Sequence, residues 1–308
     1  MDFEKIIEKL THEYTGRLIN VLESKSSYDR RSYGFEYEFL PEIALDLNYM
    51  KKLYEFLPHC GFILQKDSFL HPTGTRITFE PGGQIEYQSI PLFPEDMGIF
   101  SSILELIRDT NERIFKELDI LYIATGFIPD RGGAPLCLEA DRYKNLHARM
   151  PQVGSRGLEM MKGTASIHLH VVIMNISELV LFFTRLCEVS SSDDFRMQAE
   201  RRDILNNTDP SRCGFDCGSI RRDFLPQQLI SALVRFTLKA EDILTSKPFY
   251  ATENTDFDSF MYHLTTIFTD VRLNIKGPTL ELRTLDSLPI PAFEVKWRKF
   301  IEIMEDVR

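Results

Sequence analysis

The stretch Glu80–Gln88, which reads EPGGQIEYQ, decides the fold together with the residues Arg76–Phe79 (RITF) that precede it. After the glycines, polar and apolar residues alternate, which predicts a strand with one polar and one apolar face. The segment Pro81-Gly82-Gly83 is typical of a turn or bulge between two strands. One interpretation is an antiparallel hairpin with a solvated face. The other is that its two carboxylates and two amides gather around a metal ion or an ammonium group.

Three further stretches show the same alternation, at 33–40 (YGFEYEFL), 164–171 (TASIHLHV) and 278–283 (PTLELR). Their polar positions are Glu36 and Glu38, then Ser166, His168 and His170, and finally Glu281 and Arg283. Four such strands predict an antiparallel sheet with one buried face and one wet, acidic face. Carboxylates with an imidazole suit Mg²⁺ or Mn²⁺, and the lack of cysteine in these strands argues against a structural zinc site.

Composition narrows the class of protein. The 308 residues are 43% hydrophobic and 27% charged, as in an ordinary soluble globular protein, and a net charge of −10 argues against nucleic-acid binding. No apolar run approaches the roughly 20 residues of a membrane span. Five scattered cysteines indicate free thiols in a reducing cytoplasm. Helices are expected over 2–24, 46–57, 94–118, 176–187, 224–244, 257–268 and 292–304, with a mobile loop at 190–194.

Short motifs then follow one another along nearly the whole chain. They are GFEYE at 34–38, EPGGQIE at 80–86, RYK at 142–144, MPQVG at 150–154, LEMM at 158–161, TDPSRCG at 208–214, HLTTIF at 263–268 and LELR at 280–283. This ordered set resembles the glutamate–cysteine ligases of the plant and proteobacterial type, which are glutamine-synthetase-like carboxylate–amine ligases. The resemblance implies an α+β fold in which a curved, mostly antiparallel sheet forms an active-site bowl with helices packed outside. It implies a single catalytic domain over 1–308.

The resemblance also implies a reaction, the ATP-dependent joining of the γ-carboxylate of L-glutamate to an amine, first of all L-cysteine, through a γ-glutamyl phosphate. One Mg²⁺ or Mn²⁺ ion would be held by Glu38, Glu80 and Glu86, and another by Glu36, His168 and Glu281. Further expected roles are catalysis for Arg283 and Glu86, substrate binding for Gln84, Arg201 and Glu80, and ATP binding for Arg212, Lys144 and Arg283. The partners would be small molecules, and the chain a monomer or a homodimer.

The sequence departs from the family at several positions, so the identity of the amine substrate stays open. The chain is shorter than typical members, residues 187–195 replace the element expected before Arg201, and Asp203 and Leu205 differ from the usual pattern. A ligase for another amine is therefore an alternative, as are a guanidino-kinase-like phosphotransferase and a non-catalytic binding homologue. His168 taken alone is typical of a sheet histidine that needs no metal. His170 is left out of the expected ligands because the family carries an amide there. Arg142, Lys144 and Arg149 are all candidates for contact with ligand.

Overall fold

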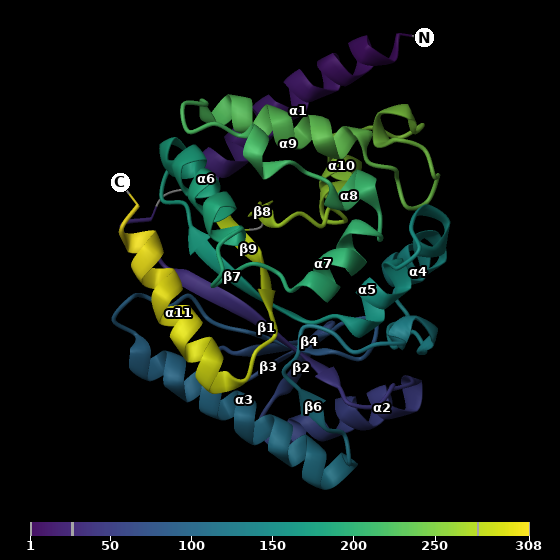
Figure 1. Ribbon diagram of the computed structural model, residues 1–308, viewed down its shortest axis with the longest axis vertical. Coiled ribbons are helices and arrows are strands. Elements are labelled where there is room, and N and C mark those ends of the chain that lie inside the picture. Colours follow the sequence, from purple (N-terminus) through teal and green to yellow (C-terminus); the bar gives the residue numbers. More distant parts are fainter. Residues whose placement is uncertain (1, 26–27, 276, 308) are drawn as a thin grey trace.

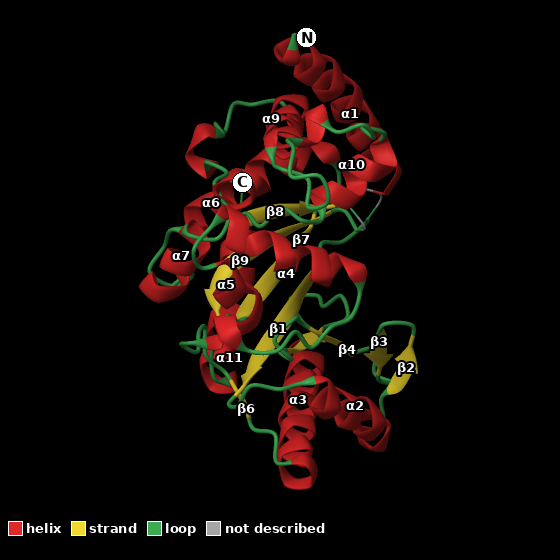
Figure 2. Ribbon diagram, turned by 90° about the vertical axis from the view of Figure 1, so that its right-hand side faces the viewer, coloured by secondary structure: helices red, strands yellow, loops and turns green. Residues whose placement is uncertain are grey.

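A nine-stranded antiparallel sheet runs through the computed structural model, which describes residues 2–25, 28–275 and 277–307 (Figures 1 and 2). The strands are β1 (Tyr33–Pro41), β2 (Ile63–Gln65), β3 (Ser68–Leu70), β4 (Arg76–Phe79), β5 (Ile85–Gln88), β6 (Tyr122–Ile123), β7 (Ser166–Val172), β8 (Val271–Asn274) and β9 (Thr279–Asp286). Their order is β2-β3-β4-β5-β1-β7-β9-β8, and β6 pairs with β1. The predicted α+β class and the predicted antiparallel sheet are confirmed.

Strand β1 lies at the centre of the sheet and fixes the register of its neighbours. Glu38 is opposite Glu86 on β5, and Glu36 is opposite both Gln88 on β5 and His168 on β7. Because side chains alternate along a strand, these polar residues all lie on one face of the sheet. The pairing thus brings together carboxylates that are far apart in the sequence.

The opposite face of the sheet is aromatic and packs on helices. The α-helices are α1 (Phe3–Lys25), α2 (Leu47–Phe56), α3 (Met97–Leu118), α4 (Asp141–Val153), α5 (Gly157–Gly163), α6 (Leu179–Ser190), α7 (Ala199–Asn206), α8 (Pro210–Cys213), α9 (Pro226–Lys239), α10 (Phe257–Leu264) and α11 (Ile290–Glu305). Phe35 of β1 meets Phe100 of α3 and Phe293 of α11 edge to face, with ring centroids 5.8 and 5.1 Å apart. Edge-to-face rings add to the gain from apolar burial, so α3 and α11 are held firmly against the sheet.

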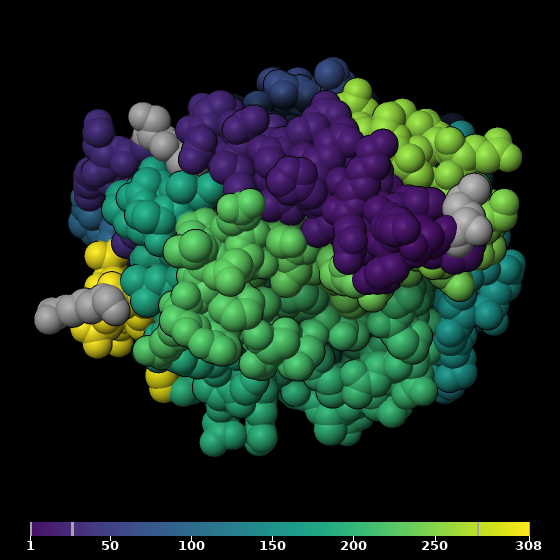
Figure 3. Space-filling model, turned by 90° about the horizontal axis from the view of Figure 1, so that it is seen from above, coloured from purple at the N-terminus to yellow at the C-terminus, as the bar shows by residue number. Residues whose placement is uncertain are grey.

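Helix α1 lies across one end of the molecule. Seen from above, its purple surface runs beside the green surface of residues from the second half of the chain, which include α9 (Figure 3). Tyr14 of α1 packs on the rings of Phe257 and Phe260, with centroids 5.5 and 4.7 Å away. No helix of the described residues is long and apolar enough to cross a membrane.

The structure corrects one expectation about the shape of the sheet. The sheet is open, with β2 and β8 at its edges, so it does not curl into a bowl by itself. Helices wall the polar face instead, as described below. The loop at 190–194 contacts α11 through Asp194, whose carboxylate lies 2.9 Å from Lys296 and also pairs with Lys299, and its expected mobility stays a prediction. The expected helices are present at every position, although the one predicted over 224–244 ends at Lys239.

Candidate functional site

A cavity of about 750 Å³ lies over the polar face of the sheet. Its floor is formed by β1, β5, β7, β8 and β9, and its walls by α4, α5, α7 and α10. The charged residues that line it are Glu36, Glu38, Glu80, Glu86, Arg142, His168, Arg201, Asp270, Arg272 and Arg283. Acidic and basic groups therefore line the same cavity. Such a site can bind an anionic ligand through its arginines and a cation through its carboxylates.

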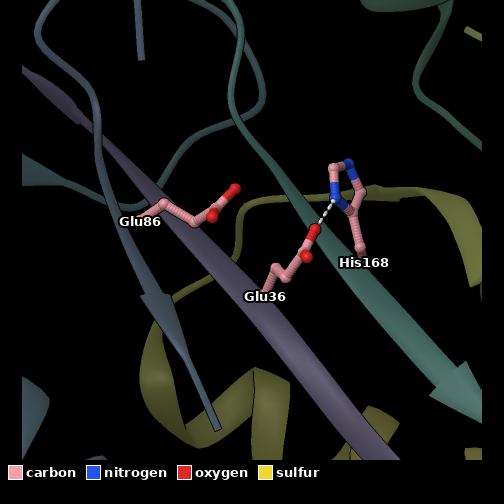
Figure 4. A group of neighbouring side chains, drawn as sticks. All are labelled: Glu36, Glu86 and His168. Carbon is pink, nitrogen blue, oxygen red and sulfur yellow. Dashed lines mark hydrogen bonds and ion pairs between the residues drawn. The ribbon is translucent and has the colours of Figure 1, made fainter. Parts of the chain in front are cut away.

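Three of these residues form a candidate metal cluster. One ligand atom each from Glu36, Glu86 and His168 lies within 4.8 Å of the others. The three side chains come from β1, β5 and β7 and point toward one another, and Glu36 Oε2 lies 2.7 Å from His168 Nδ1 (Figure 4). His168 and Glu86 are buried, so the cluster lies at the bottom of the cavity. Two carboxylates and an imidazole suit a hard divalent cation.

Glu38 and Glu80 lie beside this cluster. Glu38 Oε2 accepts hydrogen bonds from the backbone N–H and the hydroxyl of Ser166, at 2.7 and 3.1 Å, and its Oε1 is 4.0 Å from His168 Nε2. Glu80 comes directly before the Pro81-Gly82-Gly83 turn and lines the same cavity. A Cβ on Gly82 would lie 2.4 Å from the carbonyl oxygen of Lys162, so this turn fits against α5 only with glycine.

The crowded carboxylates change one another's acidity. Burial and the neighbouring Glu38 raise the pKa of Glu80 to about 8, and burial with Glu36 and Glu80 raises the pKa of Glu86 well above its usual range. Burial also acts to raise the pKa of Glu36, but His170 and His168 outweigh it and lower that pKa. Burial and then Arg283 lower the pKa of His168, which favours the neutral imidazole that binds metals. A site with this excess of carboxylates favours a cation.

Glu281 stands apart from the cluster. It is 0% exposed and does not line the cavity. Its Oε2 accepts from Arg272 Nε at 2.7 Å and Arg283 Nη1 at 3.2 Å, and its Oε1 accepts from Asn274 at 2.7 Å. Burial acts to raise the pKa of Glu281, but Arg272, then His170 and Arg283, outweigh it and lower that pKa to about 2. Arg283 does line the cavity, with Nη1 3.4 Å from His168 Nδ1, and its contact with a phosphoryl group stays a prediction.

The two residues expected to bind the amino acid lie in the cavity wall with their polar atoms engaged. The Gln84 amide donates to the carbonyls of Met161 and Thr164 at 3.1 and 3.0 Å and accepts from Gly82 N at 2.7 Å. Arg201 donates to the carbonyl of Thr284 at 2.6 Å and pairs with Asp286 at 2.5 Å. These contacts fix the shape of the wall, and substrate contact by Gln84 or Arg201 stays a prediction.

Two expected ATP-binding residues lie outside the cavity. Arg212 is fully buried, pairs with Asp209 at 2.9 Å and donates to the carbonyl of Glu241. Lys144 is exposed on α4 and does not line the cavity. The structure therefore does not bring either cation to the site: the first joins α8 to the chain around Glu241, and the second points away because of its position on the helix.

Among the three cations left open near α4, Arg142 is the one in the cavity; Arg149 instead pairs with Glu241 and donates to Ser246 at 2.8 Å. Sequence reasoning missed Arg272. The signal was available in Val271–Asn274, which reads VRLN and alternates apolar and polar residues just before the 278–283 strand.

The fold and the cavity define a class of site that gathers carboxylates, one imidazole and arginines on the wet face of an antiparallel sheet. No family model matches the chain. Curated relatives do match it. The chain is 24% identical to the chloroplastic glutamate–cysteine ligase of Solanum lycopersicum over 342 aligned residues, which cover 94% of this chain and 62% of that protein. It is 26% identical to the enzyme of the same name from Medicago truncatula over 262 residues, 71% of this chain and 49% of the relative.

A third chloroplastic glutamate–cysteine ligase, from Nicotiana tabacum, matches over 114 residues at 26% identity. The resemblance to plant glutamate–cysteine ligases is confirmed, and the chain is a distant relative of these enzymes. It spans less than two thirds of the length of the tomato relative.

Proposed function

We propose that this protein is an ATP-dependent carboxylate–amine ligase that joins the γ-carboxylate of L-glutamate to an amine, first of all L-cysteine. The observation that carries the proposal is the convergence of Glu36, Glu86 and His168 under one cavity that Arg283 also lines. The names of the relatives support the same chemistry. A glutamine-synthetase-like topology within one catalytic domain, 1–308, is part of the proposal.

The residues present fit a divalent cation. Buried carboxylates that crowd one another are stabilised by a positive ion, and oxygen-rich sites suit Mg²⁺ or Mn²⁺. Glu36, Glu86 and His168 would hold one ion. Glu38 and Glu80 would hold a second ion together with Glu86. When bound, the ion supplies charge neutralisation for the phosphates of ATP.

The reaction needs an activated carboxylate, because a free carboxylate is a poor electrophile. An oxygen of the γ-carboxylate attacks the γ-phosphorus, and the bond from this phosphorus to the ADP oxygen breaks. The amine nitrogen then attacks the acyl carbon, inorganic phosphate leaves, and an amide remains. Arg283 would donate to the phosphoryl oxygens as charge develops on them, and the cavity walls would hold the partners in line.

The test is to measure ADP formation and to identify products by mass spectrometry, with ATP, Mg²⁺ and glutamate, across the amino acids and common polyamines. Amine-dependent ADP formation together with a γ-glutamyl amide is expected, and cysteine leads the panel. ADP formed with a phosphorylated guanidino product would instead identify a phosphotransferase. No ADP with any amine would favour a non-catalytic binding protein.

The proposal also covers the cellular compartment in which the protein works. All five cysteines are unpaired, which supports a reducing compartment such as the cytoplasm. The three plant relatives are named as chloroplastic. A monomer or a homodimer is proposed for the assembly.

A further inference from the structure

Two arginines share one buried carboxylate at the edge of the cavity. Arg272 approaches Glu281 Oε2 with two nitrogens, Nε at 2.7 Å and Nη2 at 2.6 Å, and Arg283 reaches the same oxygen at 3.2 Å. Both nitrogens of this Arg272 fork bond a single oxygen, and hydrogen bonds between ionised groups are stronger than those between neutral ones. Glu281 itself is screened from the cavity, whereas both guanidinium groups line it.

This arrangement conflicts with metal binding by Glu281. The oxygen that would face an ion is occupied by Arg272 and Arg283, and the other oxygen accepts from Asn274 at 2.7 Å. A cation and the Arg272 fork cannot hold the same oxygen together. Arg272 therefore occupies the place at Glu281 that a cation would need.

The position of Arg272 suits a change of partner. It lies on the edge strand β8, and about a quarter of its side chain is exposed (24%). Arg201 is held by Asp286 and by the Thr284 carbonyl. Arg202 bonds Asp270 with two nitrogens, one to each carboxylate oxygen at 2.9 and 2.8 Å, but it does not line the cavity.

We propose that Arg272 exchanges partners: it neutralises Glu281 until a divalent cation and a nucleotide bind, and then its guanidinium moves to a phosphate of the nucleotide and releases Glu281 to the ion. A planar guanidinium suits both partners, because carboxylates and phosphates accept the same pair of parallel hydrogen bonds. The inference rests on the proposed binding of ATP and a metal ion, and it adds Arg272 as a nucleotide-binding residue.

The exchange predicts that one substitution changes the affinities for the metal ion and for the nucleotide in opposite directions. In Arg272→Gln, Glu281 loses its competing cation, so Mn²⁺ alone should bind more tightly, measured from the electron paramagnetic resonance signal of free Mn²⁺. The same variant loses a phosphate contact, so MgADP should bind about tenfold more weakly by calorimetry, since hydrogen bonds to charged groups are worth about 1.5–3 kcal/mol. Neither readout requires turnover.

Arg202→Gln is the matched control, because it breaks another two-bond arginine–carboxylate pair by an arginine outside the cavity lining, and both affinities should stay at the wild-type values. Arg272→Lys keeps the charge without the fork and should give intermediate values, and it replaces Arg272→Gln if that variant does not fold. Unchanged affinities in a folded Arg272 variant, or weaker binding of both ligands, would overturn the exchange. If the Arg272 variants show these changes in Mn²⁺ and MgADP affinity but the wild-type protein forms no amide, the proposed reaction fails and the inference stands.

Discussion

Glu86 lies where the charge of the site is most concentrated. Its Oε1 accepts from the Thr78 hydroxyl at 2.8 Å and the Gln88 amide at 2.7 Å, contacts that a glutamine carbonyl can keep. Glu86→Gln should therefore fold normally and lose one anionic metal ligand. We expect kcat to fall by at least about a hundredfold, since losing one such contact costs about 3 kcal/mol of transition-state stabilisation. The measurement is the steady-state rate across a magnesium titration.

Glu55→Gln, which changes an exposed glutamate of α2, is the control for Glu86→Gln and should keep the wild-type rate. A Glu86→Gln enzyme that matched wild type at limiting magnesium would remove Glu86 from the metal site.

Arg283 offers a second test of a single residue. Arg283→Lys replaces a fork that can bridge two phosphate oxygens with a single ammonium group. Because the contact strengthens as phosphoryl transfer proceeds, kcat should fall while the KM for ATP changes little. Initial rates at varied ATP separate the two parameters. A raised KM for ATP with an unchanged kcat would place Arg283 in ground-state binding instead.

Sequence alternation placed Glu36, Glu86 and His168 on the face of the sheet that lines the cavity, but it placed Glu281 there as well, and Glu281 does not line the cavity. It could not reveal which polar groups are already satisfied. The Gln84 amide is bonded to three backbone groups from chain segments some eighty residues apart, and such partners depend on how α5 packs against the turn at Pro81–Gly83.

Among the elements, α2 gives the clearest link between a sequence signal and stability. Asp46 caps the helix by accepting from the backbone N–H groups of Asn48 and Tyr49, at 2.8 and 3.0 Å. Asp46→Ala should lower the free energy of unfolding by about 1 kcal/mol. Urea denaturation measures this change, and ligase activity of the folded fraction should not change.

Asp109→Ala, at an exposed position inside α3, is the control for the cap and should not destabilise the protein, because alanine favours a helix interior. Equal losses in both variants would mean that the Asp46 cap contributes nothing specific.

Long, strongly patterned elements were the predictable ones. The strand at 33–40 and the helices over 2–24 and 292–304 match β1, α1 and α11 closely. The short strands β3 and β8 carry three and four residues, so the alternation within each is only a weak signal. Arg272, on β8, was missed for this reason although VRLN does alternate.

For the whole molecule, the carboxylate cluster predicts an unusual dependence of stability on pH. The pKa of Glu80 is about 8 in the folded protein against 4.5 without its surroundings, and Glu86 is shifted in the same direction. Between these values the folded state holds a proton that the unfolded state lacks, so stability falls as the pH rises from about 4.5 to 8. The slope for one group is at most about 1.4 kcal/mol per pH unit.

Urea denaturation in the presence of a chelator, at pH 6 and pH 8, measures this loss of stability. Glu80→Gln removes the charge and should flatten the difference between the two values, and saturating magnesium should flatten it in the wild type by favouring the ionised carboxylates. The difference in free energy of unfolding between the wild type and Glu80→Gln should therefore change between pH 6 and pH 8. An equal difference at both pH values would contradict the raised pKa of Glu80.

The open shape of the sheet could not be predicted from the sequence, and neither could the helices that cover its polar face. A pattern of alternation gives the faces of each strand but not the neighbours of the strand, which depend on long-range packing. The resemblance implied a bowl made by the sheet, whereas the hollow is built by α4, α5, α7 and α10.

The position of β9 has a consequence for how the protein acquires its activity. This strand inserts between β7 and β8 in the sheet, although it follows both in the chain. Pairing β7 with β9 closes a loop of more than a hundred residues, a contact that is slow to form because it is so distant in sequence. Arg283 reaches His168 only through that pairing. A chain that has built β1, β4, β5 and β7 but has not docked β9 would hold the Glu36, Glu86 and His168 cluster without its arginine, so metal capture should precede nucleotide binding during refolding.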